Sequence, residues 1–86
     1  ADYSAEELYL IFVKMCNKYD YSLSNNALEY VKTFFSDTIN SKPINFSNGR
    51  FVRNYFEKVI ENQSNRIAMA DNYDNLQEII IDDLKI

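Results

Sequence analysis

The residues with the clearest potential for chemistry lie in one short segment, Ser47-Asn48-Gly49-Arg50. Ser47 and Asn48 are of types that favour helix N-caps, and they precede the chain's only glycine and an arginine. We therefore expect Arg50 in the first turn of a helix. The helix dipole favours anions at this end, so a cation here makes better sense if an anionic ligand lies between it and the free backbone N–H groups. The segment indicates a candidate phosphate site, although arginines at helix starts are also common as solvated surface residues.

The next arginine, Arg53, follows about one helical turn later, roughly 60° further round the helix. It could contact a phosphate or another subunit, but a structural salt bridge is the interpretation that the sequence favours.

The helix that positions both arginines is predicted over residues 47–70. An apolar face at helical spacing indicates that one long side of it is buried. That face consists of Val52, Tyr55, Phe56, Val59, Ile60, Gln63 and Ile67.

Two helices precede this one. Ser4 and Glu7 form a capping box that starts the first helix, which runs to about Lys18. Its apolar stripe comprises Leu8, Ile11, Phe12, Met15 and Tyr19, and we interpret Cys16 as a small core residue. Ser24 or Asn25 can cap the second helix, which ends before Pro43, so residues 40–46 are predicted as a short connection.

The C-terminal part is less regular. Residues 76–81 fit either a short helix or an extended run, and Asp82 can cap a final turn over residues 83–86. With 86 residues, one glycine and one proline, the chain is predicted to be a single domain, 1–86. The expected class is all-α: a small four-helix bundle with a short last helix.

Composition excludes several functions. A formal charge of −4 argues against nucleic acid as a partner, and no apolar run is long enough to span a membrane, so we expect a cytoplasmic protein. The absence of histidine excludes a Ser-His or Cys-His nucleophile, and without histidine or a second cysteine an ordinary zinc site cannot form. Asp71, Asp74, Asp82 and Asp83 suggest a calcium loop only weakly, because Tyr73 occupies a ligand position and the sixth place has no glycine. The adjacent pairs Glu6-Glu7 and Asp82-Asp83 are interpreted as helix-start charges. No catalytic residue and no metal ligand is therefore predicted.

Two stretches resemble a known family. The segment Asn48-Gly49-Arg50-Phe51-Val52-Arg53-Asn54, followed by Phe56-Glu57 and Gln63-x-x-Arg66, resembles the C-terminal lid subdomain of AAA+ ATPases of the CbbX and stage V sporulation protein K type. The stretch Asp2-Tyr3-Ser4-x-Glu6-Glu7-Leu8 resembles the entry into the same lid. The resemblance covers about residues 2–84, with the least agreement after residue 76.

The resemblance implies a nucleotide-linked role. Arg50 would be the sensor-2 arginine that reaches the phosphates of ATP, with Asn48 and Gly49 beside it and Arg53 as a weaker candidate. Gln63 and Arg66 would be structural. The ATP and its Mg²⁺ would be held mainly by a large subdomain that this chain lacks, because a phosphate-binding loop needs two glycines and the chain has one. The chain alone is then expected to be a monomer without ATPase activity.

The implied partners are the protein's own large subdomain and the neighbouring protomer of a ring, whose motions remodel a client protein. Seven tyrosines and six phenylalanines are many for so small a core, and Tyr3, Tyr9, Tyr21 and Tyr73 are the candidates for a docking face. The alternative is a free-standing helical protein–protein interaction module that binds no nucleotide.

Overall fold

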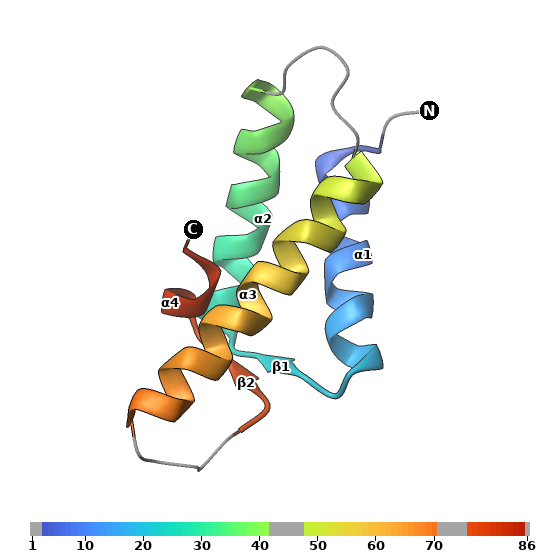
Figure 1. The fold of residues 1–86 in the computed structure, drawn as a ribbon. Helices are drawn as coiled ribbons and strands as arrows, with labels where there is room; N and C mark the ends of the chain where they lie inside the picture. Colours follow the sequence, from blue (N-terminus) through green and yellow to red (C-terminus); the bar gives the residue numbers. More distant parts are fainter. Residues whose placement is uncertain (1–2, 42–47, 71–75, 86) are drawn as a thin grey trace.

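The computed structural model describes residues 3–41, 48–70 and 76–85. Four helices occupy most of this part of the chain: α1 (Ala5–Lys18), α2 (Asn25–Ser41), α3 (Asn48–Ala70) and α4 (Ile81–Leu84). Two short strands, β1 (Ser22–Leu23) and β2 (Glu78–Ile79), complete it. The all-α prediction is confirmed (Figure 1). None of the described helices is long and apolar enough to cross a membrane.

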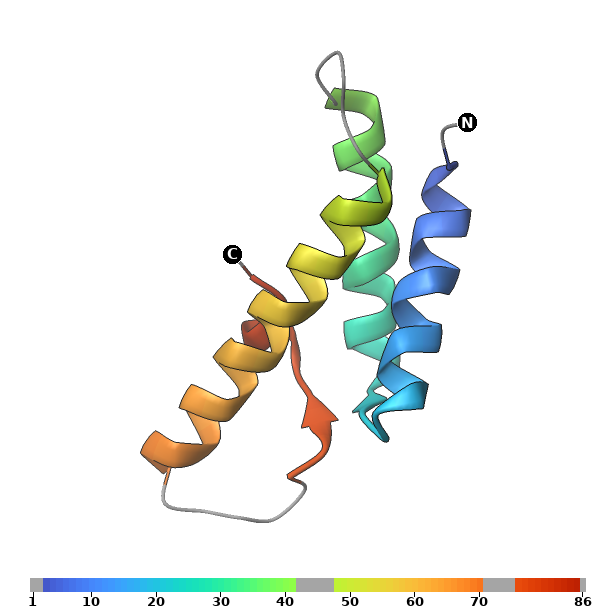
Figure 2. The ribbon, with the colours of Figure 1, turned by 45° about the vertical axis from the view of Figure 1, so that its right-hand side comes forward.

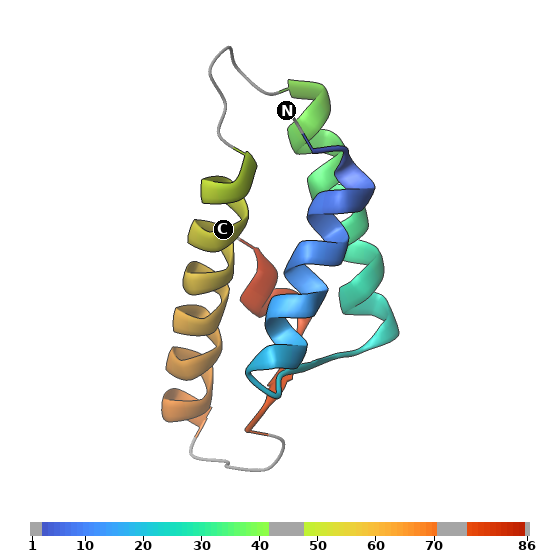
Figure 3. The ribbon, with the colours of Figure 1, turned by 90° about the vertical axis from the view of Figure 1, so that its right-hand side faces the viewer.

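Helices α1 and α2 form an antiparallel pair, and α3 crosses them obliquely (Figures 1 and 2). Seen from the side, the C-terminal segment, residues 76–85, runs between α3 and this pair (Figure 3). Strand β2 pairs in parallel with β1, with Ser22 opposite Glu78 and Leu23 opposite Ile79. The C-terminal segment is therefore joined to the connection between α1 and α2.

The predicted start of α1 is confirmed. The Glu7 amide donates to Ser4 Oγ at 3.1 Å, and the Ser4 amide donates back to Glu7 Oε1 at 2.9 Å, which completes the capping box. At the other end Asp20 adopts a left-handed conformation with φ of 64°. The Tyr21 amide then donates to the Cys16 carbonyl at 2.8 Å and the Asp20 amide to Asn17 at 3.1 Å, the two bonds of a Schellman motif.

Helix α2 starts where the sequence places its cap, because Ser24 Oγ accepts from the Ala27 amide at 3.2 Å. It continues through Asn40 and Ser41. The predicted connection over residues 40–46 therefore began too early, since the restriction that Pro43 imposes acts only on the residue directly before it. Residues 42–46 lie outside the described part of the chain.

The core is aromatic at its centre. Phe12 of α1 packs edge-on against Phe35 of α2 and Phe56 of α3, with ring centroids 5.9 and 6.1 Å away, and lies 5.4 Å from Tyr55. The buried apolar residues are Leu8, Phe12, Cys16, Ala27, Val31, Phe35, Val52, Tyr55, Phe56, Val59, Ile79 and Leu84. Every helix and β2 contributes to this core, so the described elements form one folding unit.

Two further details of the sequence prediction are wrong. Tyr19 is not a core residue: α1 ends at Lys18, and Tyr19, in the C-cap position, is 52% exposed. The last helix does not start at an Asp82 cap but spans Ile81–Leu84, with Ile80 in the N-cap position. Ile80 has no side-chain acceptor, and its own amide instead donates to Asp83 Oδ2 at 3.0 Å.

Candidate functional site

The candidate site is the start of α3, which the sequence predicted at about the same position. Arg50 lies in the first turn and its side chain is exposed. Arg53, one turn later, is also exposed. Within the described residues neither arginine forms an ion pair, so the salt bridge favoured for Arg53 is not found there. Both guanidinium groups are left available to a group outside these residues.

Gly49 adds open space to this end of the helix. A Cβ at this position would meet no atom within 4 Å, and the residue has no positive φ. The packing and the backbone of the described chain therefore do not require glycine here. Asn48 begins α3, and its side chain, like all of Ser47, lies outside the described residues.

The start of α3 is held rigidly by the core directly behind it. Val52 is fully buried, and the Tyr55 ring stacks on Phe34 of α2 at a centroid distance of 4.4 Å. The Tyr55 hydroxyl donates to the Leu84 carbonyl at 2.8 Å. Burial raises the pKa of this phenol above its usual value, so it remains a hydrogen-bond donor at neutral pH. The exposed arginines therefore lie on a helix that packs against α2 and is hydrogen-bonded to the C-terminal segment.

Further along, α3 holds the C-terminal segment through polar side chains. Gln63, 2% exposed, donates from Nε2 to the carbonyls of Leu76 and Glu78. Arg66 Nε donates to Asp83 Oδ1 at 2.9 Å, and Arg66 Nη2 donates to Asp83 Oδ2 at 3.1 Å and to the Glu78 carbonyl at 3.0 Å. Gln63 and Arg66 therefore have the structural role that the resemblance implied for them.

Asp83 is the important residue that sequence reasoning missed. It was interpreted as a helix-start charge, yet it is 1% exposed and forms a two-point ion pair with Arg66. Asp82 beside it is exposed. No spacing signal indicated this burial, because helical periodicity places both aspartates away from the face shared by Ile81 and Leu84.

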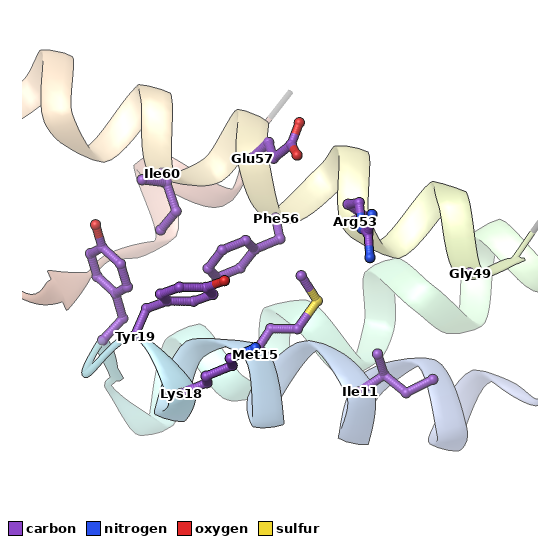
Figure 4. Close-up of a pocket in the computed structure, with 10 residues that line it drawn as sticks. Ile11, Met15, Lys18, Tyr19, Gly49, Arg53, Phe56, Glu57 and Ile60 are labelled. Carbon is purple, nitrogen blue, oxygen red and sulfur yellow. The ribbon is translucent and has the colours of Figure 1, made fainter.

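A groove of about 910 Å³ lies between α1 and α3, and Gly49 and Arg53 are among the residues that line it (Figure 4). Of the tyrosines proposed as a docking face, Tyr9 and Tyr21 line different pockets. Tyr3 is exposed, Tyr9 and Tyr21 are half-buried, and Tyr73 lies outside the described residues. Of these, Tyr21 borders the groove.

The structure is that of a small helical domain whose third helix begins with exposed arginines. Comparison with known families identifies the class of this domain. The AAA lid domain family matches residues 4–86, and the chain belongs to this family. It is 42% identical over 91 residues to stage V sporulation protein K of Bacillus subtilis (strain 168), an alignment that covers 99% of this chain and 27% of that protein. The chain thus spans about a quarter of the length of this relative. No solved structure matches significantly.

Proposed function

We propose that this lid domain closes over ATP bound by an α/β subdomain elsewhere in the same polypeptide, and that Arg50 contacts the phosphates. The observation that carries the proposal is the exposed Arg50, in the first turn of the helix that packs against the rest of the domain and without an ion-pair partner among the described residues. A guanidinium group can bind two phosphate oxygens at once through parallel hydrogen bonds.

The residues around Arg50 fit such a ligand. The open space beside Gly49 lets a phosphate approach the backbone N–H groups at the helix start, where the dipole favours an anion. Asn48 is the first residue of this helix, and Arg53 supplies a second positive charge one turn away. The Mg²⁺ that accompanies ATP would be held by the α/β subdomain, because this segment offers donors and no carboxylate.

The same helix provides a means of relaying nucleotide state. Helix α3 contacts α1, β2 and α4, and its rings stack on those of α2. A pull on Arg50 would consequently move the whole domain as a rigid body. We propose that this motion is passed to the neighbouring protomer of a ring and used to remodel a client protein.

The functional test is Arg50→Ala in the longer polypeptide that contains this chain. The arginine would stabilise charge that develops during phosphoryl transfer, so we expect ATP turnover to fall by about 10²-fold. Arg53→Ala, which removes an equal charge one turn away, should reduce turnover less. ATP hydrolysis at the parental rate in Arg50→Ala would refute the proposed role.

A stability measurement separates this role from a structural one. In the 86-residue chain Arg50→Ala should change the free energy of unfolding by less than about 1 kcal/mol, as exposed substitutions do. Phe56→Ala, which deletes a core ring, should cost about 3–5 kcal/mol. If Arg50→Ala unfolds the chain, the arginine is structural and the proposal fails.

The parent gene offers an independent check. A G-x-x-x-x-G-K-[ST] loop in the same polypeptide would favour the ATPase role, because that loop supplies the backbone cradle for the phosphates. Its absence would favour the free-standing interaction module.

A further inference from the structure

The groove between α1 and α3 has an apolar floor that is accessible from outside the domain. Met15 of α1 and Phe56 and Ile60 of α3 lie along it, and Tyr19 lies at one end (Figure 4). Tyr21 is also among the lining residues. The Tyr19 and Phe56 ring centroids are 5.7 Å apart, so the exposed tyrosine continues the apolar surface of the core outward.

The groove is long enough for a secondary-structure element. Its α3 wall runs from Gly49 to Ile60. At 1.5 Å per residue this wall measures about 16 Å, which is about three turns of an α-helix. Apolar grooves between two helices commonly bind the apolar face of an amphipathic helix.

The charges at the groove differ from the net charge of the 86-residue chain. Lys18 and Arg53 line it, whereas the chain as a whole carries a formal charge of −4. Arg53 projects from α3 toward α1, while Glu57, the acidic residue of the lining, points away from α1 (Figure 4). Neither Lys18 nor Arg53 forms an ion pair with the residues that the structure describes.

We propose that this groove binds an amphipathic helix of a partner protein, with large aliphatic side chains on its apolar face and carboxylates along the edges of that face. We infer the aliphatic side chains of the partner helix from the apolar floor of the groove. We infer its carboxylates from Lys18 and Arg53, which they would complement in charge. This interaction goes beyond the proposed nucleotide contact, with which it shares Gly49 and Arg53.

Two synthetic peptides test the proposal. Each is a helix of about four turns with leucines at positions i, i+3, i+4 and i+7; one has glutamates beside the leucines and the other has lysines. Titration into the isotope-labelled 86-residue chain should give saturable amide shifts at Met15, Tyr19 and Phe56 with the acidic peptide. The basic peptide should bind at least about tenfold more weakly.

Variants locate the charge effect. The double variant Lys18→Glu with Arg53→Glu should remove or invert the preference for the acidic peptide, and both residues are exposed, so the fold should remain intact. The double variant Lys14→Glu with Lys58→Glu is the matched control, because it reverses two charges at exposed lysines of α1 and α3 that do not line the groove. It should retain the preference. Unchanged circular dichroism and melting temperature would verify that each variant is folded.

Three results with the 86-residue chain would overturn the proposal. They are the absence of saturable binding, equal affinity for the two peptides, and shifts that lie away from the groove. A fourth is a loss of more than about tenfold in affinity when the longer polypeptide replaces the 86-residue chain, since the rest of the polypeptide would then cover the groove.

Discussion

The Asp83 carboxylate receives hydrogen bonds from two different parts of the fold. Arg66 Nε and Nη2 reach it from α3, and the Ile80 amide reaches it from the residue before α4. Arg66 remains 32% exposed, so the pair is only partly removed from water. Such a pair stabilises the fold mainly because the loss of one partner leaves the other with unmet hydrogen bonds.

We expect Asp83→Ala to lower the free energy of unfolding by about 2–3 kcal/mol. Asp82→Ala, which removes an exposed carboxylate from the adjacent residue, should change it by less than about 0.5 kcal/mol. Urea unfolding followed by circular dichroism measures both values. Equal effects of the two substitutions would show that the Arg66 pair contributes no more than a surface charge.

Cys16 gives the domain a predictable response to alkaline pH. Burial raises the pKa of its thiol from 9.0 to about 12. The folded state therefore retains the thiol proton more tightly than the unfolded state. This contribution to stability is complete below about pH 9 and is lost as the pH rises from 9 toward 12.

The corresponding prediction compares the parent chain with Cys16→Ala at pH 8 and pH 10.5. The parent should lose about 1–2 kcal/mol more than the variant over this interval. Burial is the main cause of the raised Tyr55 pKa and the neighbouring Cys16 thiolate a smaller one, so this phenol stays protonated in both folded proteins at pH 10.5 and contributes nearly equally to both losses. Parallel losses in the two proteins would mean that the thiol is not protected in the folded state.

At the scale of elements, the C-terminal segment behaves as part of the core and not as a tail. Ile79 of β2 and Leu84 of α4 are both fully buried. A four-residue helix and a two-residue strand are too short to be stable alone, so contacts with α3 and β1 must hold them.

We expect a chain that ends after residue 75 to lose cooperative unfolding. Removing one buried Ile or Leu side chain costs about 2–5 kcal/mol, and the whole stability of a domain of this size is about 4–13 kcal/mol. Thermal melting monitored by circular dichroism, with nuclear magnetic resonance signal dispersion, would detect the loss. A sharp transition near the parental melting temperature would instead show that α1, α2 and α3 suffice.

The difference between contacts within one helix and contacts between distant segments explains what could and could not be predicted from the sequence. The capping box at Ser4 and the buried faces of α1 and α3 follow from spacing within one helix, so they were predicted. The burial of Asp83 depends on Arg66, and the short strands depend on each other; both are contacts between distant parts of the chain. The position of Arg50 follows from residue types and spacing within one helix, so it was predicted. The groove is formed by two helices together, so it was not predicted.

The 86-residue chain is an elongated domain measuring 42 × 20 × 19 Å, with its candidate nucleotide contacts near one end of α3. To the proposed nucleotide site the described residues contribute exposed arginines and a helix start, and the sequence contains no phosphate-binding loop. An incomplete site of this kind predicts weak binding.

We expect the 86-residue chain to be a folded helical monomer that binds ATP far more weakly than micromolar. One exposed arginine and a helix start contribute about 1–2 kcal/mol, whereas micromolar affinity needs about 8 kcal/mol. Isothermal titration calorimetry with ATP, after sedimentation to establish the monomer, checks this value. Micromolar binding would mean that this chain alone builds most of the nucleotide site.

The parallel pairing of β1 with β2 also determines when the domain can finish folding during synthesis. Helices α1 and α2 contact each other locally and can associate soon after they leave the ribosome. Strand β1, however, must wait for β2, because Ser22 pairs with Glu78 and helices α2 and α3 are made between the two strands. Until then the positions that Ile79 and Leu84 fill remain open to water and to other nascent chains. Translation pauses before residues 76–85 would prolong that exposure and favour aggregation, whereas uninterrupted synthesis would allow these residues to close the domain.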